Sequence, residues 1–399
     1  MRIHSRRSVL AGVAALGGCA ALPGEPSSGG PAVLPPPPVP FDEAVAAAAD
    51  AVMASVAVAG GRRTMVIDPL VDGVTGDQSA ATQTIQARIT GLARGRYPQL
   101  DIQPFSARTL SQAPLLMVGT FTPVNAQVQT AGTREAFRFC LVMADLQSGK
   151  AIAKKVTRAR LDGVDTTPTR FFQDSPVWTD DANVKSYVAT CQSTRVGDPI
   201  NPVYLDGILT ASIISEAIEA YAAERYANAA ELYRNAQNTR AGNQLRVYNG
   251  LYLTSWKLGR RNDAAEAFGR LVDFSLANNR LAVKLLFRPG STGIADGADA
   301  PYDLWLREIA AHAGQRNTCL EVSGHTSKTG SPQLNERLSL ARAEFVKARL
   351  ENAVPALRGR LIATGAGSNR NLIGTGADNA SDALDRRVEF GVVQSCART

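Results

Sequence analysis

The residues of this chain that could support catalysis or bind a metal are few. The 399 residues include five cysteines and three histidines, His4, His312 and His325. Three histidines so far apart do not predict a clustered zinc site, and they offer few candidates for the base of a Ser-His-Asp hydrolase. The cysteines form no Cys-x-x-Cys pair, which argues against zinc knuckles and thioredoxin-like motifs. We therefore expect a binding protein without a metal or cofactor rather than an enzyme.

The first cysteine has the sequence context of an export signal. A basic start with Arg2, Arg6 and Arg7 is followed by an uncharged run, 9–18, and then Cys19. The run is too short to span a bilayer, which needs about 20 apolar residues, and it is typical of a signal peptide. The alternative is an ordinary signal peptide that is cut nearby and leaves Cys19 as a free thiol.

The Leu-Gly-Gly-Cys tetrad at 16–19 resembles the bacterial lipobox. By that resemblance residues 1–18 are a signal peptide and Cys19 becomes the acylated first residue of the mature protein. Ala20 directly after the cysteine resembles lipoproteins sorted to the outer membrane. The pair Arg6-Arg7 also resembles a twin-arginine signal, so the export route stays open between Sec and Tat. We expect a lipid-anchored protein of the outer membrane that faces the periplasm.

The segment after the cysteine reads as a tether. Residues 19–41 are rich in proline, glycine and serine and end in the run Pro-Pro-Pro-Pro-Val-Pro. Such a composition cannot form a core, and its proline run favours extended polyproline II geometry. The formal net charge of +7 includes three arginines of the leader, and no dense Lys/Arg stripe is interleaved with aromatic residues. We therefore expect no nucleic-acid partner.

Four cysteines remain for an oxidising compartment, an even number that allows two disulfides. Cys140 and Cys191 belong to one predicted segment, and Cys319 and Cys396 belong to another. Pairing within segments is the arrangement that we expect. The alternative is four buried thiols, since sequence alone does not fix the connectivity.

Residues 42–200 predict an α/β domain. Apolar spacing indicates helices over 41–58 and around Ile85 and Ile89, and further runs indicate strands over 64–67, 115–121 and 137–143. A Ser-Gly-Lys turn at 148–150 predicts a hairpin. The order of these elements resembles the periplasmic domains of CsgG, LpoB and the amino-terminal part of TolB. That resemblance implies protein contacts, and hence an envelope protein partner.

The aromatic segment from Arg170 to Asp174, together with Trp178, allows two interpretations. Phe171 and Phe172 could form an exposed recognition patch with the tryptophan. The alternative is that these rings pack the loop onto its own domain.

Residues 201–278 predict a helical repeat. Ala229, Tyr233 and Ala236 have a spacing that Ala264, Phe268 and Leu271 repeat 35 residues later. This resembles a pair of tetratricopeptide repeats, which use small residues where helices cross. Two repeats are fewer than a free-standing stack needs, so we expect this segment to lean on a neighbour. A plain helical linker without a groove is the alternative.

Residues 279–399 predict a third domain, with strands over 281–287 and 319–323 and a helix around Trp305. A further helix starts at Ser331 as N-cap and Pro332 at the first helical position. Its predicted apolar stripe comprises five residues: Leu334, Leu338, Ala341, Phe345 and Val346. Arg342 lies in line with that stripe, either as a buried anion-binding arginine or as one whose stem packs while its head reaches solvent.

The motifs Gly324-His325-Thr326, 334–343, 365–368 and 385–390 together resemble the OmpA-like carboxy-terminal domain. The resemblance implies a mixed sheet with helices on one side and, in many members, non-covalent binding of the peptide stem of peptidoglycan. The family's carboxylate-binding arginine maps onto Arg342, and its Arg-Arg pair maps onto Arg386 and Arg387. A planar guanidinium suits bidentate binding of a carboxylate.

The family's ammonium-binding aspartate, which follows the Gly-His-Thr element, does not carry over because its position holds Ser327. A second acid of the family is replaced around Gly290. Either another acid such as Asp378 or Asp382 takes the role, or the ligand differs, or the domain is a scaffold. We expect a peptidoglycan contact through Thr326, Ser327, Arg342, Arg386 and Arg387, with no catalytic or metal site.

The sequence thus predicts an α+β multidomain protein. It comprises an α/β domain, a short helical-repeat segment and an OmpA-like mixed sheet with helices, preceded by an anchor and tether. The expected function is an outer-membrane lipoprotein that links the outer membrane and a protein partner to the cell wall. The alternative is a periplasmic assembly scaffold or activator whose OmpA-like domain does not bind peptidoglycan.

Overall fold

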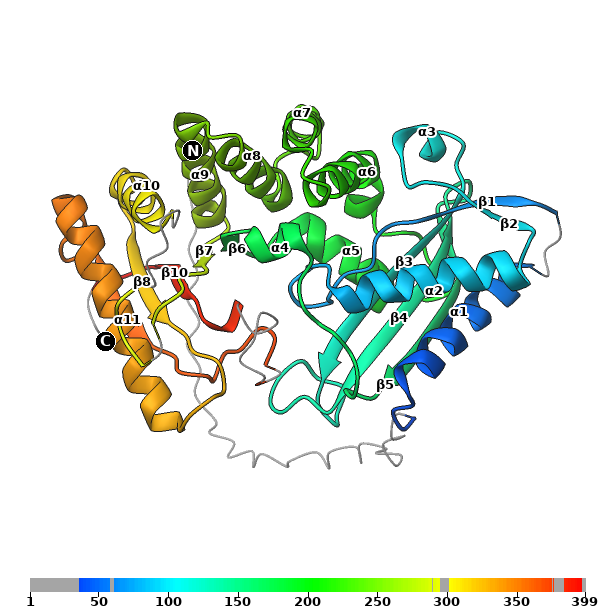
Figure 1. Cartoon of the computed structure of the whole chain (residues 1–399), viewed down its shortest axis with the longest axis horizontal. Coiled ribbons are helices and arrows are strands. Elements are labelled where there is room, and N and C mark those ends of the chain that lie inside the picture. The colour runs from blue at the N-terminus through cyan, green and yellow to red at the C-terminus, as the bar shows by residue number, and fades with distance from the viewer. Residues whose placement is uncertain are drawn as a thin grey trace, which may run out of the picture. The chain divides into compact units, whose positions relative to one another are not determined.

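The computed structural model describes residues 36–57, 61–288, 290–294, 301–374, 376 and 384–396. The predicted signal peptide, Cys19 and most of the tether lie outside these residues, as do Asp378 and Asp382. Residues 36–399 form one compact unit, whose described part contains two five-stranded sheets and eleven α-helices (Figure 1). This mixed architecture confirms the predicted α+β fold class. None of the described helices has the length and apolar character needed to cross a membrane.

The first sheet has the order β2-β1-β3-β4-β5. Its strands are β1 (Arg63–Ile67), β2 (Leu100–Ile102), β3 (Leu115–Val124), β4 (Ala136–Asp145) and β5 (Lys150–Ala159). The strands β2, β1 and β3 are parallel, whereas β3, β4 and β5 are antiparallel. The predicted strands and the hairpin through the Ser-Gly-Lys turn are therefore confirmed.

Helices cover both faces of this sheet. On one face, α1 (Phe41–Ala57) and α2 (Ala80–Arg96) share a core with inward residues of β3 such as Leu115 and Met117. On the other, α5 (Ala182–Gln192) and the first half of α6 (Pro202–Ala222) pack against Leu116 and Val118. The short helix α3 (Ala107–Leu110) precedes β3. Because both faces are buried, β3 is apolar along nearly its whole length rather than alternating.

Four helices follow in the middle of the chain, namely α6, α7 (Tyr226–Gln237), α8 (Leu245–Lys257) and α9 (Arg261–Ala277). The small and aromatic residues of the 35-residue pattern are all fully buried on α7 and α9. A Cβ atom on Gly250 would lie 2.3 Å from the ring of Tyr233, so the glycine lets α8 approach α7 closely. The relation to tetratricopeptide repeats stays a prediction.

The aromatic segment forms the short helix α4 (Arg170–Asp174) and lies in the interior. Phe171 and Phe172 are buried in the core of the four helices, and the Phe171 ring stacks on Tyr233 at 5.8 Å between centroids. Trp178 is also buried. The packing alternative holds rather than the recognition patch. Phe171 and Phe172 pack against α6–α9 rather than against the first sheet, and Trp178 packs with Ala282, Leu372 and Leu384.

The second sheet has the order β6-β7-β10-β8-β9. Its strands are β6 (Val177–Trp178), β7 (Arg280–Val283), β8 (Cys319–Gly324), β9 (Leu361–Gly365) and β10 (Val388–Val393). Only β8 and β9 are parallel to each other. The predicted strand over 281–287 is too long, because the amide of Leu285 bonds back to the carbonyl of Val283 and turns the chain out of the sheet.

Helices α10 (Tyr302–Gly314) and α11 (Pro332–Ala353) share one core with this sheet, and the 3-10 turn η1 (Pro355–Leu357) follows them. The Ser331 side chain accepts from the Leu334 amide, which confirms the predicted N-cap. The predicted stripe is rotated, because Leu334 is 56% exposed. Val346 of the predicted stripe and Arg342 in line with it are buried, and the other buried residues of α11 are Asn335, Ser339, Ala343 and Leu350.

The rotation follows from how closely the first turns of α11 approach the sheet. A Cβ atom on Gly324 would lie 2.0 Å from the carbonyl oxygen of Ser339, and one on Gly365 would lie 2.7 Å from that of Glu336. The strand ends leave no room for large side chains there, so small and polar residues occupy the helix face.

Two cysteine pairs are bonded. Cys140 on β4 is joined to Cys191 on α5, and Cys319 on β8 is joined to Cys396 beyond β10. Each pair lies within the segment from which the sequence predicted it. Covalent links thus hold a helix to the first sheet and the carboxy-terminal residues to the second.

Candidate functional site

The loop after β8 carries the Gly-His-Thr element and is held on three sides. The amide of His325 donates to the carbonyl of Arg387 (3.0 Å), and the amide of Thr326 donates to that of Gly367 (2.9 Å). The side-chain amide of Asn335 on α11 donates to the carbonyl of Ser327 (3.4 Å). The loop is therefore fixed in place before any ligand binds.

The hydroxyl of Thr326 is buried without a hydrogen-bond partner in the described part of the chain, and the side chain is only 4% exposed. An unsatisfied buried polar group costs about 1–3 kcal/mol, so its presence calls for an explanation. The neighbouring Ser327 hydroxyl lies 2.9 Å from that of Thr329. A ligand that donates to this loop would find hydroxyl acceptors rather than a carboxylate.

Arg342 lies on the buried face of α11 and is 6% exposed. Its Nε donates to the carbonyl oxygen of Ser291 (3.1 Å), and its Nη2 lies 3.5 Å from that of Arg288. The guanidinium lies over the ring of Phe287, 4.7 Å from the centroid. Of the two alternatives from the sequence, the buried arginine holds, because the head group stays between the helix and the loop after β7.

The loop that carries Thr326 and Ser327 lies against the same face of α11 as Arg342. Asn335, which holds the Ser327 loop, and Arg342 are seven residues apart on α11, which corresponds to a rise of roughly 10 Å along the axis. The structure thus brings the hydroxyl loop and the guanidinium to the same side of the same helix. A ligand with two polar ends could contact both.

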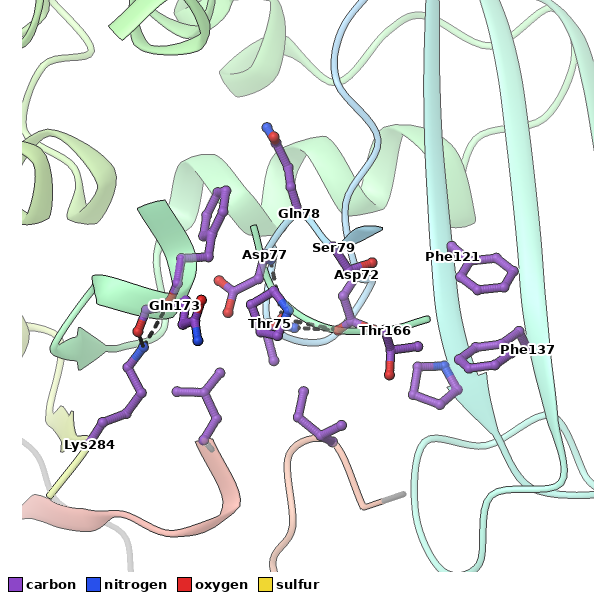
Figure 2. A pocket seen from close by; sticks show the side chains of 15 residues that line it. Asp72, Thr75, Asp77, Gln78, Ser79, Phe121, Phe137, Thr166, Gln173 and Lys284 are labelled. Carbon is purple, nitrogen blue, oxygen red and sulfur yellow. Dashed lines mark hydrogen bonds between the residues drawn. The ribbon is translucent and has the colours of Figure 1, made fainter. Parts of the chain in front are cut away.

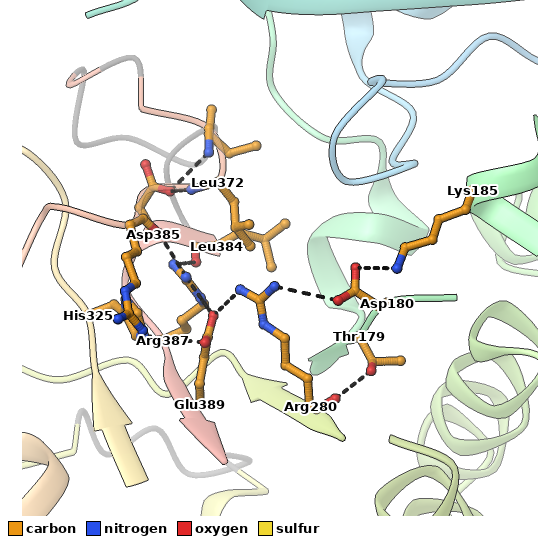
Figure 3. Close-up of polar contacts among 12 residues, drawn as sticks. Thr179, Asp180, Lys185, Arg280, His325, Leu372, Leu384, Asp385, Arg387 and Glu389 are labelled. Atoms are coloured by element: carbon orange, nitrogen blue, oxygen red, sulfur yellow. Dashed lines mark hydrogen bonds and ion pairs between the residues drawn. The ribbon is translucent and has the colours of Figure 1, made fainter. Parts of the chain in front are cut away.

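Arg386 and Arg387 differ in their surroundings, although they are adjacent. Arg386 is partly exposed, whereas Arg387 is 1% exposed and belongs to a cluster of charges beneath the sheet end (Figure 3). The Nε and Nη2 of Arg387 both lie 2.6 Å from Oε1 of Glu389. Its remaining donors bond the carbonyls of Leu384 and Arg370. Four of the five N–H donors of Arg387 are thus engaged inside the protein.

The same cluster reaches the residues upstream of α5. Arg280 on β7 donates to Oε1 of Glu389 (2.6 Å) and lies 3.8 Å from Oδ2 of Asp180. Its guanidinium also lies over the ring of Trp178 on β6. Glu389 therefore pairs with two arginines. Arg387 lies in the carboxy-terminal segment, and Arg280 contacts β6 and connects it with the second sheet.

His325 lies against this cluster, with Nε2 3.6 Å from Oε2 of Glu389. Burial lowers the pKa of His325, although the nearby Glu389 works in the opposite direction. Burial alone would raise the pKa of Glu389, but His325, Arg387 and Arg280 outweigh it and hold that pKa well below its usual range. Burial of His325 beside this cluster therefore favours the neutral imidazole.

No group of three or more His, Cys, Asp or Glu side chains within the described residues is arranged to hold a metal ion. The binding candidates are thus the hydroxyl loop and Arg342.

Residues 286–383 match the family model described as the OmpA family. The chain contains an OmpA family domain. The match starts just after β7 and includes the Gly-His-Thr element, α11 and Arg342. A search of curated proteins finds no match to the chain.

Solved structures similar to this chain cover between 28% and 30% of it. A peptidoglycan-associated lipoprotein from Burkholderia pseudomallei is 23% identical over 30% of this chain and 92% of its own, with a TM-score of 0.25. The cell wall anchor of the T6SS from Pseudomonas aeruginosa is 25% identical over 28% and 79%, with a TM-score of 0.24. An outer membrane protein from Borrelia burgdorferi B31 is 22% identical over 29% and 88%, with a TM-score of 0.23.

Asn335, inside the OmpA family domain, and Asp385, just after it, have roles that the sequence did not reveal. Asn335 holds the Ser327 loop. The sequence feature that could have identified it is its position seven residues before Arg342 on the same helix. The Asp385 carboxylate accepts from the amides of Leu372, Ile373 and Gly374 at 2.7–3.0 Å. Asp385 precedes the predicted Arg-Arg pair, but nothing in its spacing indicates that it organises a loop.

Proposed function

We propose that this chain is an outer-membrane lipoprotein whose OmpA family domain binds peptidoglycan non-covalently from the periplasmic side. Acylation of Cys19 would supply the lipid anchor, and residues 19–41 would form the tether. The α/β and helical segments upstream would bind an envelope protein partner. The protein would thereby link the outer membrane and that partner to the cell wall.

The observation that carries the proposal is the buried guanidinium of Arg342 on α11. It lies within the residues that match the OmpA family model, and by the resemblance in sequence it maps onto the family's carboxylate-binding arginine. A planar, rigidly held guanidinium binds a carboxylate through two parallel hydrogen bonds. Its fixed contacts with Ser291 and Phe287 reduce the entropy lost on binding.

The other end of the ligand would meet Thr326 and Ser327. The unsatisfied hydroxyl of Thr326 and the hydroxyl of Ser327 can accept from an ammonium group, but neither carries a charge. A hydrogen bond with a charged group contributes about 1.5–3 kcal/mol, so losing one such interaction weakens binding about ten- to a hundredfold. We therefore propose a weak, carboxylate-centred contact.

A scaffold without wall binding is the second candidate. The observation that favours it is Ser327 at the position of the family's ammonium-binding aspartate, together with the internal bonding of Arg387. In that case the domain would serve assembly of an envelope complex, and its partner would bind elsewhere on the chain.

Sedimentation with purified cell-wall sacculi tests the proposal, using the full chain in mild detergent at low salt. We expect wild type to sediment with the sacculi and Arg342→Ala to stay largely in the supernatant. Arg349→Ala is the matched control, because Arg349 lies on the same helix but is exposed and pairs with Asp303. If wild type does not sediment, the wall-binding proposal fails. Co-purification of one stoichiometric envelope partner, unchanged by Arg342→Ala, would then support the scaffold.

A further inference from the structure

The cavity beside Asp77 and Lys284 has room for a few water molecules only (Figure 2). Its volume is about 40 Å³, and a buried water needs about 10–15 Å³ of such space. The Asp77 carboxylate and the Lys284 ammonium are also electrostatic partners of each other. This cavity is therefore too small for an organic ligand, and its two charges already have partners.

Strand β5, by contrast, forms an outer edge of the first sheet and is strongly basic. Residues 150–161, which comprise β5 and the two residues after it, contain five Lys or Arg and no Asp or Glu. This segment alone has a formal charge of +5, whereas the whole chain has +7. Figure 1 shows β5 beside α1 at this side of the sheet. Most of the net positive charge of the protein is therefore concentrated at one sheet edge.

The cations of this segment form no ion pair with Asp or Glu within the described part of the chain. Arg138 on β4 lies directly opposite Arg158 in the β4–β5 ladder, where like charges repel each other. Burial lowers the pKa of Lys154, and repulsion from Arg138 adds to this effect, whereas Asp198 opposes it. The edge therefore presents a positive potential that an anionic surface would neutralise.

Exposed apolar side chains lie among these cations. Val156 on β5 is 43% exposed, and Leu161 just after β5 is 37% exposed. The loop after α5 runs beside the same strand, because the amide of Gly197 donates to a β5 carbonyl (2.8 Å). This loop adds the exposed Arg195 and Val196, the latter 60% exposed. We refer to β5, residues 160–161 and residues 195–196 together as the basic edge.

The described chain begins at the basic edge. The amide of Val39 donates to the carbonyl of Arg158 (3.0 Å), and the amide of Arg160 donates to that of Val39 (2.9 Å). The Arg158 side chain also donates to the carbonyl of Pro36 (3.3 Å). Residues 19–35 join this point to the proposed lipid anchor. A membrane that holds the anchor would therefore be connected to the protein at the basic edge.

We propose that the basic edge binds the surface of a membrane that contains anionic phospholipids. The exposed Lys155, Arg160 and Arg195 would contact lipid phosphates. The apolar side chains among them would lie at the boundary between headgroups and acyl chains, where surfaces that combine basic and apolar residues bind. The inference rests on the proposed lipid anchor for its location, because anchor and edge would bind the same membrane. An acidic protein would suit the charge but not the position of the chain start.

Co-sedimentation with vesicles tests the proposal on residues 20–399, which contain every described residue and both disulfides but neither the leader nor Cys19. One set of vesicles contains roughly 30% phosphatidylglycerol in phosphatidylcholine, and the other contains phosphatidylcholine alone. At about 50 mM NaCl we expect binding to the first set to be at least about tenfold tighter than to the second. At about 500 mM NaCl this binding should be lost, because salt screens charges at a surface.

A combined variant with Lys155→Gln, Arg160→Gln and Arg195→Gln removes three exposed cations of the basic edge. Each cation near an anionic membrane strengthens binding about fivefold. We therefore expect at least about tenfold weaker binding of this edge variant to the phosphatidylglycerol vesicles. Circular dichroism checks that the variant is folded.

The matched control combines Arg94→Gln, Arg108→Gln and Arg260→Gln. It removes three exposed cations on α2, on α3 and before α9, and it should bind like the unsubstituted protein. The proposal is overturned if residues 20–399 do not sediment with the phosphatidylglycerol vesicles at low salt. It is also overturned if they bind both sets equally, or if the folded edge variant binds like the control.

Lipidated full-length protein tests the anchor separately. Its acyl chains should carry it into both sets of vesicles, whatever their charge. If it fails to bind phosphatidylcholine alone, the proposed anchor fails, whereas the result for the basic edge on residues 20–399 is unaffected.

Discussion

Two arginines of the carboxy-terminal sheet region are buried to a similar degree but held by different groups. Arg387 bonds the Glu389 carboxylate through two nitrogens, and Arg280 shares the same carboxylate. Arg342 bonds main-chain carbonyl oxygens and lies over the ring of Phe287. The first arrangement balances formal charges within the protein. The second includes carbonyl dipoles and a π-face against the guanidinium.

Burial of a charged side chain therefore does not by itself identify a binding site. An arginine within a carboxylate cluster stabilises the fold, since breaking such a pair leaves a buried charge uncompensated. An arginine oriented by carbonyl dipoles is positioned at smaller cost, and its removal affects mainly what it binds. The variants below test whether Arg387 contributes mainly to stability and Arg342 mainly to ligand binding.

The largest effect is expected for Arg387→Met. The substitution leaves the buried Glu389 with Arg280 as its remaining arginine partner, and removing one member of a buried ion pair costs about 3–5 kcal/mol. Urea unfolding followed by circular dichroism measures the change. Arg386→Met is the control at the adjacent, partly exposed position, and it should cost less than a third as much. Equal effects of the two variants would show that the cluster does not stabilise the fold.

A smaller loss of stability is expected for Arg342→Met. The methionine stem keeps much of the packing. The loss includes the bonds to Ser291 and Arg288 and the contact with the Phe287 ring, which together contribute about 1–2 kcal/mol. The same urea experiment measures it, with Arg349→Met as the control on the exposed side of α11. A loss as large as that of Arg387→Met would remove the distinction between the two arginines.

The sequence placed these two arginines in one predicted ligand-binding set, whereas the structure gives them different surroundings for a physical reason. Local patterns predicted the hairpin of the first sheet, the N-cap at Ser331 and the positions of several helices such as α1, α2 and α11, because each depends on nearby residues. The environment of Arg387 depends on Glu389, on Arg280 more than a hundred residues upstream, and on β6. Such long-range packing leaves no periodic signal in the sequence.

The buried face of α11 is a second feature that local sequence patterns did not predict correctly. Spacing placed Leu334 on the buried stripe, whereas close approach of the helix to Gly324 and Gly365 buries Asn335 and Ser339 instead. The pocket at Asp77 and Lys284 was not predicted at all, since its lining residues are up to 312 positions apart in the chain. Only the folded arrangement brings these residues together.

A gain of binding is expected for Ser327→Asp if Arg342 is one end of a two-ended ligand site. A carboxylate in the loop would add a charged partner for the ligand ammonium, and we expect sacculus binding to tighten about tenfold. Gln333→Glu adds the same charge at an exposed position in the first turn of α11 and should change binding little. Equal gains in both variants would indicate a general charge effect, and no gain would indicate a different ligand geometry.

The smallest effect is expected from the pH dependence of the Arg387 cluster. Burial lowers the pKa of His325 below its ordinary value of 6.5, so the unfolded chain takes up this proton at a higher pH than the folded protein. The free energy of unfolding therefore falls as the pH drops below about 6.5, by at most about 1.4 kcal/mol per pH unit. Glu389 stays ionised in this range, because its pKa is held well below its usual value.

Urea unfolding of wild type and His325→Gln at pH 7.5 and 5.5 isolates this contribution. Burial raises the pKa of Asp68 to about 6 and also raises that of Asp77, and both acids work in the opposite direction as the pH falls. They titrate equally in wild type and variant, so the difference between the two pH dependences belongs to His325. We expect the variant to lose less stability on acidification than wild type. Parallel curves would mean that His325 accepts a proton as readily in the folded protein as in the unfolded chain, and the cluster around Arg387 would then not exclude water.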